Sequence, residues 1–207
     1  GLGNDFILTH HRDYPENTHF PTLAQTWCER HFGIGADGLI VSCDSQLGDQ
    51  KMRIFNADGT EAEMCGNGLR CFIKYLKHVQ GLAQQEFRIE TLAGIMEANY
   101  LFDEMIEVNM GTPILEPKEI PFGDFTYTPV QNYPLSCLDH SFKITMVSMG
   151  NPHCVIFTAS VMKIPLEAYG PVIENHSLFP QKTNVEFVEI LDRQRAKMRV
   201  WERGSGI

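Results

Sequence analysis

The sequence predicts an α/β protein of the α+β type, made of two like-folded, pseudo-symmetric units that arose by internal duplication. The run M-R-I-F at 52–55 recurs as M-R-V-W at 198–201, which is 146 residues later. The pair G-N at 3–4, ahead of one apolar run, recurs 147 residues later at 150–151. Two motifs in the same order with nearly one offset favour duplication over chance. A cleft between the two halves is the expected ligand site.

The first unit, residues 1–111, is predicted to be strands with a central helix. Partial period-two alternation predicts strands at 6–9, 52–55, 87–91, 95–99 and 105–110. Thr22 and Gln25 have the spacing of a capping box, which predicts an early helix that ends at Gly33.

The central helix follows a polar loop at residues 56–71. Apolar residues recur at three- and four-residue spacing from 69 to 79, and a glycine stop follows. Cys65 is therefore predicted to lie at the helix N-terminus, where unpaired N–H groups and the helix dipole favour a thiolate. Gly66 and Gly68 let the backbone approach a bound carboxylate. This predicts a nucleophile or base beside an anion site, and a small buried thiol is the alternative.

The second unit is predicted to cover residues 112–207, and a proline-marked stretch at 112–134 links it to the first. Strands are predicted at 144–147, 154–158, 185–190 and 198–201, and Pro165 and Pro171 interrupt the helical pattern between them. By the offset of 146, a counterpart of Cys65 belongs at about position 211, beyond Ile207. The second unit is therefore expected to be incomplete and to have little core of its own. Because the chain also begins at Gly1 without Met, truncation at both ends is the interpretation.

Composition restricts the class of protein. The net charge of -9 argues against nucleic acid or an anionic membrane as a partner, and 43% hydrophobic residues suit a soluble globular protein. No run of about 18 apolar residues predicts a transmembrane helix. The six cysteines are too few and too irregularly spaced for a disulfide scaffold of this length. We expect reduced thiols in a cytoplasm.

Several other chemistries are disfavoured. G-I-G-A-D-G at 33–38 matches the dinucleotide pattern, but it follows a helix and leads into an apolar run rather than a helix. The Cys and His spacings give no convincing set of four zinc ligands. A Cys–His hydrolase built on Cys65 and His153 lacks an evident third group to orient the histidine. The glycosylation sequon at 175–177 is incidental in a reducing compartment. We predict no metal and no cofactor.

Six long motifs together resemble the diaminopimelate epimerase family. They are G-L-G-N-D-F at 1–6, R-H-F-G-I-G-A-D-G at 30–38, the run 53–67, M-G-N-P-H-C at 149–154, T-N-V-E-F at 183–187 and W-E-R-G-S-G at 201–206. The resemblance implies two pseudo-symmetric units, each a strand-rich roll around a central helix. It also implies interconversion of LL- and meso-diaminopimelate, in lysine and peptidoglycan biosynthesis, by two cysteines on opposite faces of the α-carbon. Cys65 matches the first cysteine, and the second is the one expected near 211.

The resemblance assigns roles to further residues. His153 and Glu202 match groups that help set the protonation of the cysteines. Backbone donors of Gly66 and Asn67 would bind the carboxylate at the reacting centre. Binding of the substrate is assigned to a further set of matched residues, in which Glu202 appears again: Asn4, Asn56, Asn151, Asn184, Glu202 and Arg203. Without the motif context, such asparagines are usually turn residues, a lone histidine is often a core residue, and a Glu-Arg pair is usually solvated.

The resemblance also implies a small-molecule substrate, no cofactor and a homodimer. Two alternatives stay open. One is a related racemase of another amino acid such as proline or hydroxyproline, although four of the matched side chains suit a substrate with a second amino-carboxylate end better. The other is a non-catalytic short form that binds the diamino acid or a full-length partner.

Overall fold

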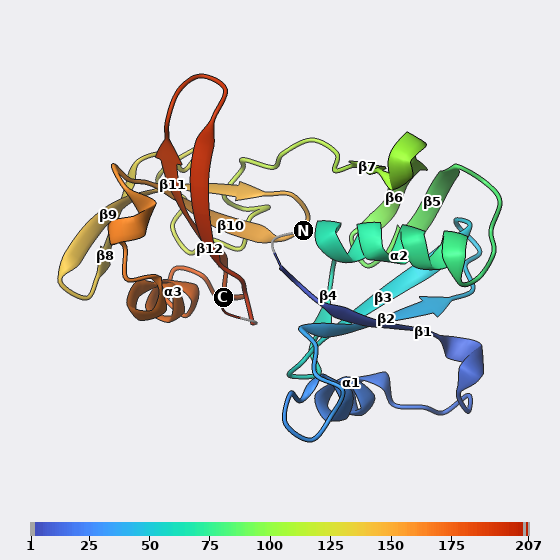
Figure 1. Ribbon diagram of the computed structural model, residues 1–207. Coiled ribbons are helices and arrows are strands. Elements are labelled where there is room, and N and C mark those ends of the chain that lie inside the picture. The colour runs from blue at the N-terminus through green and yellow to red at the C-terminus, as the bar shows by residue number, and fades with distance from the viewer. Residues whose placement is uncertain (1–2, 205, 207) are drawn as a thin grey trace. The chain divides into compact units, whose positions relative to one another are not determined.

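The computed structural model describes residues 3–204 and 206. Gly1, Leu2 and Ser205, which belong to the motifs above, and Ile207 lie outside the described residues. The chain divides into two compact units, Gly1–Met110 and Gly111–Ile207 (Figure 1).

Unit 1 is a mixed sheet with one helix on each face. Its strands are β1 (Phe6–His10), β2 (Gly38–Cys43), β3 (Gln50–Asn56), β4 (Glu61–Ala62), β5 (Glu86–Thr91), β6 (Gly94–Tyr100) and β7 (Ile106–Asn109). Its helices are α1 (Phe20–Cys28), α2 (Gly66–His78) and the short 3-10 turns η1 (His11–Asp13) and η2 (Phe102–Glu104). The strand order is β1-β2-β3-β5-β6-β7, and β4 pairs with β3 outside this path.

Alternation along β2 explains why this strand is buried on both faces. Ile40 belongs to the apolar cluster under α2, whereas its neighbours Leu39 and Val41 belong to the cluster under α1. Successive side chains of a strand point to opposite faces, so one apolar run serves two helices. Figure 1 shows α1 and α2 on opposite sides of the β1-β2-β3 strands.

The predicted start and end of the first helix are wrong. Helix α1 begins at Phe20, and its N-cap is His19, whose ring nitrogen Nδ1 accepts from Thr22 N at 3.4 Å. Pro21 in the first turn fits this start, because that position needs no N–H donor. The helix ends at Cys28, well before Gly33. Gly33 lies instead in a tight turn, where an added Cβ would come within 2.4 Å of the carbonyl oxygen of Thr26.

Unit 2 is a five-stranded sheet with the order β12-β11-β10-β9-β8. Its elements are β8 (Tyr133–Cys137), β9 (His140–Ser148), β10 (Pro152–Phe157), η3 (Val161–Lys163), α3 (Leu166–Glu174), β11 (Asn184–Ile190) and β12 (Ala196–Trp201). Strand β8 begins inside the stretch that the sequence assigns to a linker. It contains Pro134, which is tolerated because β8 is an edge strand.

Both units share one frame, which confirms the predicted duplication. In unit 1, β2 pairs parallel with β1 and antiparallel with β3, and in unit 2, β11 pairs parallel with β10 and antiparallel with β12. The registers coincide, since Phe6 pairs with Gly38 and His153 pairs with Asn184. Helix α3 begins and ends 146 residues after α1.

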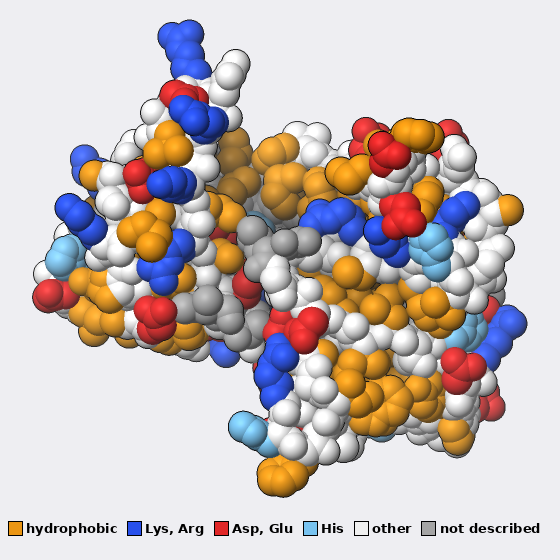
Figure 2. Space-filling model, viewed as in Figure 1, with side chains coloured by type: hydrophobic (Ala, Val, Ile, Leu, Met, Phe, Trp, Pro, Cys, Tyr) orange, Lys and Arg blue, Asp and Glu red, His pale blue; other side chains and the backbone are white. Residues whose placement is uncertain are grey.

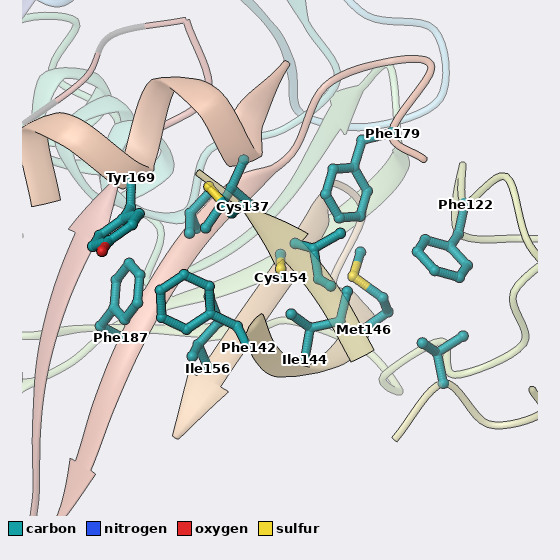
Figure 3. Packing of buried hydrophobic residues seen from close by; sticks show 14 of the residues in the cluster. Phe122, Cys137, Phe142, Ile144, Met146, Cys154, Ile156, Tyr169, Phe179 and Phe187 are labelled. Carbon is teal, nitrogen blue, oxygen red and sulfur yellow. The ribbon is translucent and has the colours of Figure 1, made fainter. Parts of the chain in front are cut away.

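The expectation that unit 2 has little core is wrong. Its cluster contains 17 buried hydrophobic residues, including Ile120, Phe122 and Val130 from the proline-marked stretch. Figure 3 shows Phe142, Phe187 and Tyr169 gathered beside α3; the Phe142 and Tyr169 rings meet edge-on at 5.1 Å between centroids. The stretch that the sequence suggested to be a linker therefore supplies part of this core.

Apolar side chains also reach the surface of unit 1. Figure 2 shows them gathered over α1, where Tyr14, Leu23 and Trp27 are only partly buried. None of the described helices is long and apolar enough to cross a membrane.

Candidate active site

Cys65 is the N-cap of helix α2, as the sequence predicts. Its backbone is extended, with φ -144° and ψ 112°, and its Sγ accepts from the backbone N–H of Gly68 at 3.3 Å. A Cβ on Gly68 would lie 3.0 Å from Ile40 Cδ1 and 3.5 Å from the Cys65 sulfur. Glycine at this position therefore leaves room for the sulfur at the helix end, where N–H groups and the dipole stabilise negative charge.

A chain of amide contacts fixes Asn67 and Asn4 beside this helix end. Asn67 Nδ2 donates to Asn4 Oδ1 at 2.7 Å, and Asn4 Nδ2 donates to Asp37 Oδ2 at 3.1 Å. Arg70, one turn further along α2, donates to Asn67 Oδ1, the carbonyl oxygen of the same side-chain amide. Each amide thus has a defined orientation, and Asn4, Gly66 and Asn67 lie together with Cys65.

The G-I-G-A-D-G motif contributes to this network through Asp37, a role that the glycine pattern itself does not indicate. Arg30 donates to Asp37 at 2.7 Å and to Asp5 at 2.8 Å. The hydrogen bond from Arg30 holds the pKa of the Asp5 carboxyl below its ordinary value. Asp37 in turn orients Asn4, and the loop leads into β2 rather than into a helix. The signal that could have identified this role was an Arg and an Asp flanking a glycine turn next to a predicted strand.

Asn56 is held in a different local structure. Its Nδ2 donates to Thr60 Oγ1 at 2.9 Å within the turn that connects β3 to β4. Among the described contacts, none joins the Asn56 side chain to Asn4 or Asn67.

In unit 2, the candidate residues gather at one end of the sheet. The imidazole of His153 lies 2.9 Å from Asn151 Oδ1 through Nε2 and 2.6 Å from Glu186 Oε1 through Nδ1. The T-N-V-E-F motif contains Glu186, but the resemblance assigns this residue no role. An acid inside the otherwise apolar run from Val185 to Val188 was the signal that could have singled it out.

Asn184 connects two chain segments at this end. It is buried, its Nδ2 donates to Pro152 O at 3.0 Å, and its Oδ1 accepts from Arg203 N at 2.8 Å. Glu202 is held by backbone bonds with Gly206 at 2.7 and 2.9 Å. Asn184 thereby brings the segment with Asn151 and His153 next to the segment with Glu202 and Arg203.

One group of possible metal ligands occurs among the described residues. His10, His11 and Asp44 offer atoms within 4.8 Å of one another. Arg12 donates to both oxygens of Asp44 at 2.7 Å, so a cation there would meet a positive charge. None of the candidate site residues named above belongs to this group, so it gives no reason to assign a metal to them.

Comparison with known proteins identifies relatives of the whole chain. The family model for diaminopimelate epimerase matches residues 1–116 and 145–207. The diaminopimelate epimerase of Carboxydothermus hydrogenoformans is 51% identical over 208 residues, which cover all of this chain and 75% of that protein. The diaminopimelate epimerase of Synechocystis is 47% identical over 212 residues, with the same two coverages.

Solved structures show the same fold at much lower identity. A probable proline racemase from Agrobacterium radiobacter has a TM-score of 0.63 and 14% identity, covering 90% of this chain and 62% of that one. A phenazine biosynthesis protein of the PhzF family from Bacillus anthracis has a TM-score of 0.59 and 19% identity, with coverages of 97% and 67%. These likenesses concern the fold alone.

Proposed function

The chain belongs to the diaminopimelate epimerase family, and on this premise we propose that Cys65 exchanges the α-proton of diaminopimelate as the LL and meso forms interconvert. The observation that carries the proposal is the position of Cys65 as the N-cap of α2, within the motif shared with the family. A thiolate there removes the α-proton, and the thiol returns one, without a metal or other cofactor.

The start of α2 also suits the substrate's α-carboxylate. The N–H groups of Gly66 and Asn67 belong to the first turn and have no partner four residues earlier within the helix. Negative charge that develops as the α-proton leaves is stabilised by such donors and by the helix dipole. Asn4 and Asn67, whose amides are fixed by Asp37 and Arg70, are proposed to orient the same end of the substrate.

Unit 2 is proposed to supply the remaining groups. His153 and Glu202 would exchange protons with the reacting thiols, and Arg203 would bind a carboxylate through its guanidinium. Asn151, Asn184 and Asn56 are proposed to bind the ammonium and carboxylate groups of the distal end. Inversion needs a second acid on the opposite face of the α-carbon, and a second cysteine at about position 211 stays the prediction for it.

Location and assembly follow as finer proposals. A catalytic thiol must remain reduced, which supports a cytoplasmic location. A homodimer is proposed because the family resemblance implies one. The proline and hydroxyproline alternative has weaker support, because the relatives at about half identity are diaminopimelate epimerases, whereas the proline racemase shares the fold at 14% identity.

The test is deuterium exchange at the α-carbons of LL-diaminopimelate in D₂O, measured by NMR and chiral chromatography. Cys71 provides a matched control, because it is an exposed cysteine on the same helix. We expect exchange by the wild-type chain, its loss in Cys65→Ala and its retention in Cys71→Ala.

Two outcomes contradict the proposal. Exchange that persists in Cys65→Ala would assign the proton transfer to another group. Binding of diaminopimelate by the wild-type chain without any exchange would favour the non-catalytic alternative.

A further inference from the structure

The two units carry opposite chemistry at a structurally equivalent pair of positions, which is apolar in unit 1 and polar in unit 2. The matched registers place Phe6 of β1 opposite Gly38 of β2, with Ile40 two residues further along. In unit 2, His153 of β10 takes the position of Phe6. Asn184 and Glu186 of β11 take those of Gly38 and Ile40. Phe6 and Ile40 belong to the apolar cluster under α2, whereas His153 and Glu186 form a hydrogen bond of 2.6 Å.

Glu186 is an unusual residue for this place. It is 6% exposed, and its Oε2 is buried without a hydrogen-bond partner among the residues that the structure describes. A buried carboxylate is unfavourable unless it is paired, and its described partner is His153 Nδ1. The shared frame is compatible with apolar side chains at both positions, as unit 1 shows. Folding therefore does not explain the acid, and its contact with a candidate catalytic residue does.

We infer that Glu186 is a positioning residue that holds a proton on Nδ1 of His153 and so confines proton exchange to Nε2. An ionised carboxylate can only accept, so Nδ1–H must donate to it. This inference rests on the proposed function for the role of His153, but the hydrogen-bond geometry itself does not depend on that function.

Asn151 fits both protonation states of Nε2. A protonated Nε2 donates to Asn151 Oδ1, which lies 2.9 Å away. A deprotonated Nε2 accepts from the amide NH₂ group once the Asn151 amide turns by 180°. The ring can therefore gain or lose a proton at Nε2 while Nδ1 and the ring orientation remain fixed by Glu186. Carboxylates that orient a functional histidine in this way are a recurrent arrangement.

The test is the tautomer of neutral His153, read from the ¹⁵N chemical shifts of its ring nitrogens. The wild-type chain is expected to carry the proton on Nδ1. Glu186→Ile introduces the residue type of Ile40, the counterpart of Glu186 in unit 1. In this variant, the acceptor that still contacts the imidazole ring is Asn151 Oδ1, which lies beside Nε2. We therefore expect the proton to move to Nε2 in that variant. Glu186→Gln keeps an acceptor for Nδ1–H and is expected to keep the wild-type tautomer.

Glu189→Ile is the matched control, because Glu189 lies on the same strand and accepts from Val161 N instead. It should leave the His153 tautomer unchanged. In the α-proton exchange assay, Glu186→Ile should lower kcat about 10- to 100-fold with KM within about twofold, whereas Glu189→Ile should retain the wild-type values.

The outcomes separate this inference from the proposed function. An unchanged Nδ1–H tautomer in Glu186→Ile overturns the positioning role, whatever the activity. A switched tautomer with wild-type exchange kinetics also overturns it, because Nε2 would then not take part. The proposed function is judged separately, by comparing the wild-type chain with Cys65→Ala.

Discussion

Unit 1 and unit 2 have the same three-strand frame but place opposite chemistry in it. In unit 1, Phe6 and Ile40 pack in the apolar cluster beneath α2, and the proposed catalytic thiol, Cys65, lies outside the sheet at the N-cap of that helix. In unit 2, His153 and Glu186 bring polar chemistry onto the strands themselves. After a duplication, one copy of a position can remain a packing residue while the other acquires a functional one. The apolar copy then shows what the fold alone requires.

The largest effect is expected from giving unit 1 the acid of unit 2. Ile40 is fully buried, and Ile40→Glu would place an unpaired carboxylate under α2. We expect a loss of about 3–5 kcal/mol in the free energy of unfolding, measured with urea. Val79→Glu adds the same charge at an exposed position and should change stability by less than about 0.5 kcal/mol. Wild-type stability of Ile40→Glu would mean that unit 1 does not need an apolar residue there.

A second comparison concerns the thiols of the two units. Burial raises the pKa of Cys28 to about 11 and raises that of the fully buried Cys154 well above its ordinary value. At pH 8, the thiolate fraction of Cys28 is therefore about one in a thousand. Iodoacetamide should modify Cys65 and the exposed Cys71 at least about 100-fold faster than Cys28 or Cys154, as measured by peptide mass spectrometry. Equal rates at Cys65 and Cys28 would contradict the assignment of a reactive thiol to the helix N-cap.

The counterpart of Gly38 in unit 2 is Asn184, and removing its amide should be moderately destabilising. Asn184→Ala leaves the buried Pro152 carbonyl and the Arg203 N–H without these partners. We expect a loss of about 1–3 kcal/mol in the free energy of unfolding, measured by chemical denaturation. Asn175→Ala is the control, since that amide is exposed and bonds within its own helix end. If both variants lose the same stability, Asn184 does not connect the two segments as inferred.

The smallest stability effect is expected from converting unit 2 to the pattern of unit 1. The double variant His153→Phe with Glu186→Ile replaces the buried polar pair by the apolar pair of the other copy. Replacing both partners of a hydrogen-bonded polar pair by apolar residues of similar shape can be nearly neutral or stabilising, so we expect the free energy of unfolding to stay within about 1 kcal/mol of wild type, or to increase. Proton exchange should be lost. A stability loss above about 3 kcal/mol would show that unit 2 needs the polar pair to fold.

Much of the frame could be predicted from the sequence because it depends on local patterns. Strands β3, β5, β6 and β12 follow from alternation, and α2 follows from its apolar spacing and the loop before it. The start of α1 was mispredicted because the ring of His19 acts as the cap, although Thr22 and Gln25 fit a commoner pattern. The core of unit 2 was underestimated because residues such as Phe122 come from a stretch without clear periodicity.

The sequence by itself determined the duplication, the family resemblance and the position of Cys65 at a helix N-terminus, because spacing along the chain carries these features. Only the tertiary structure decided that Asp37 orients Asn4, that Asn184 joins two segments and that Glu186 meets His153. These contacts join residues about 30 positions apart, and parallel strand pairing brings them together. No local pattern specifies which side chains then meet across neighbouring strands.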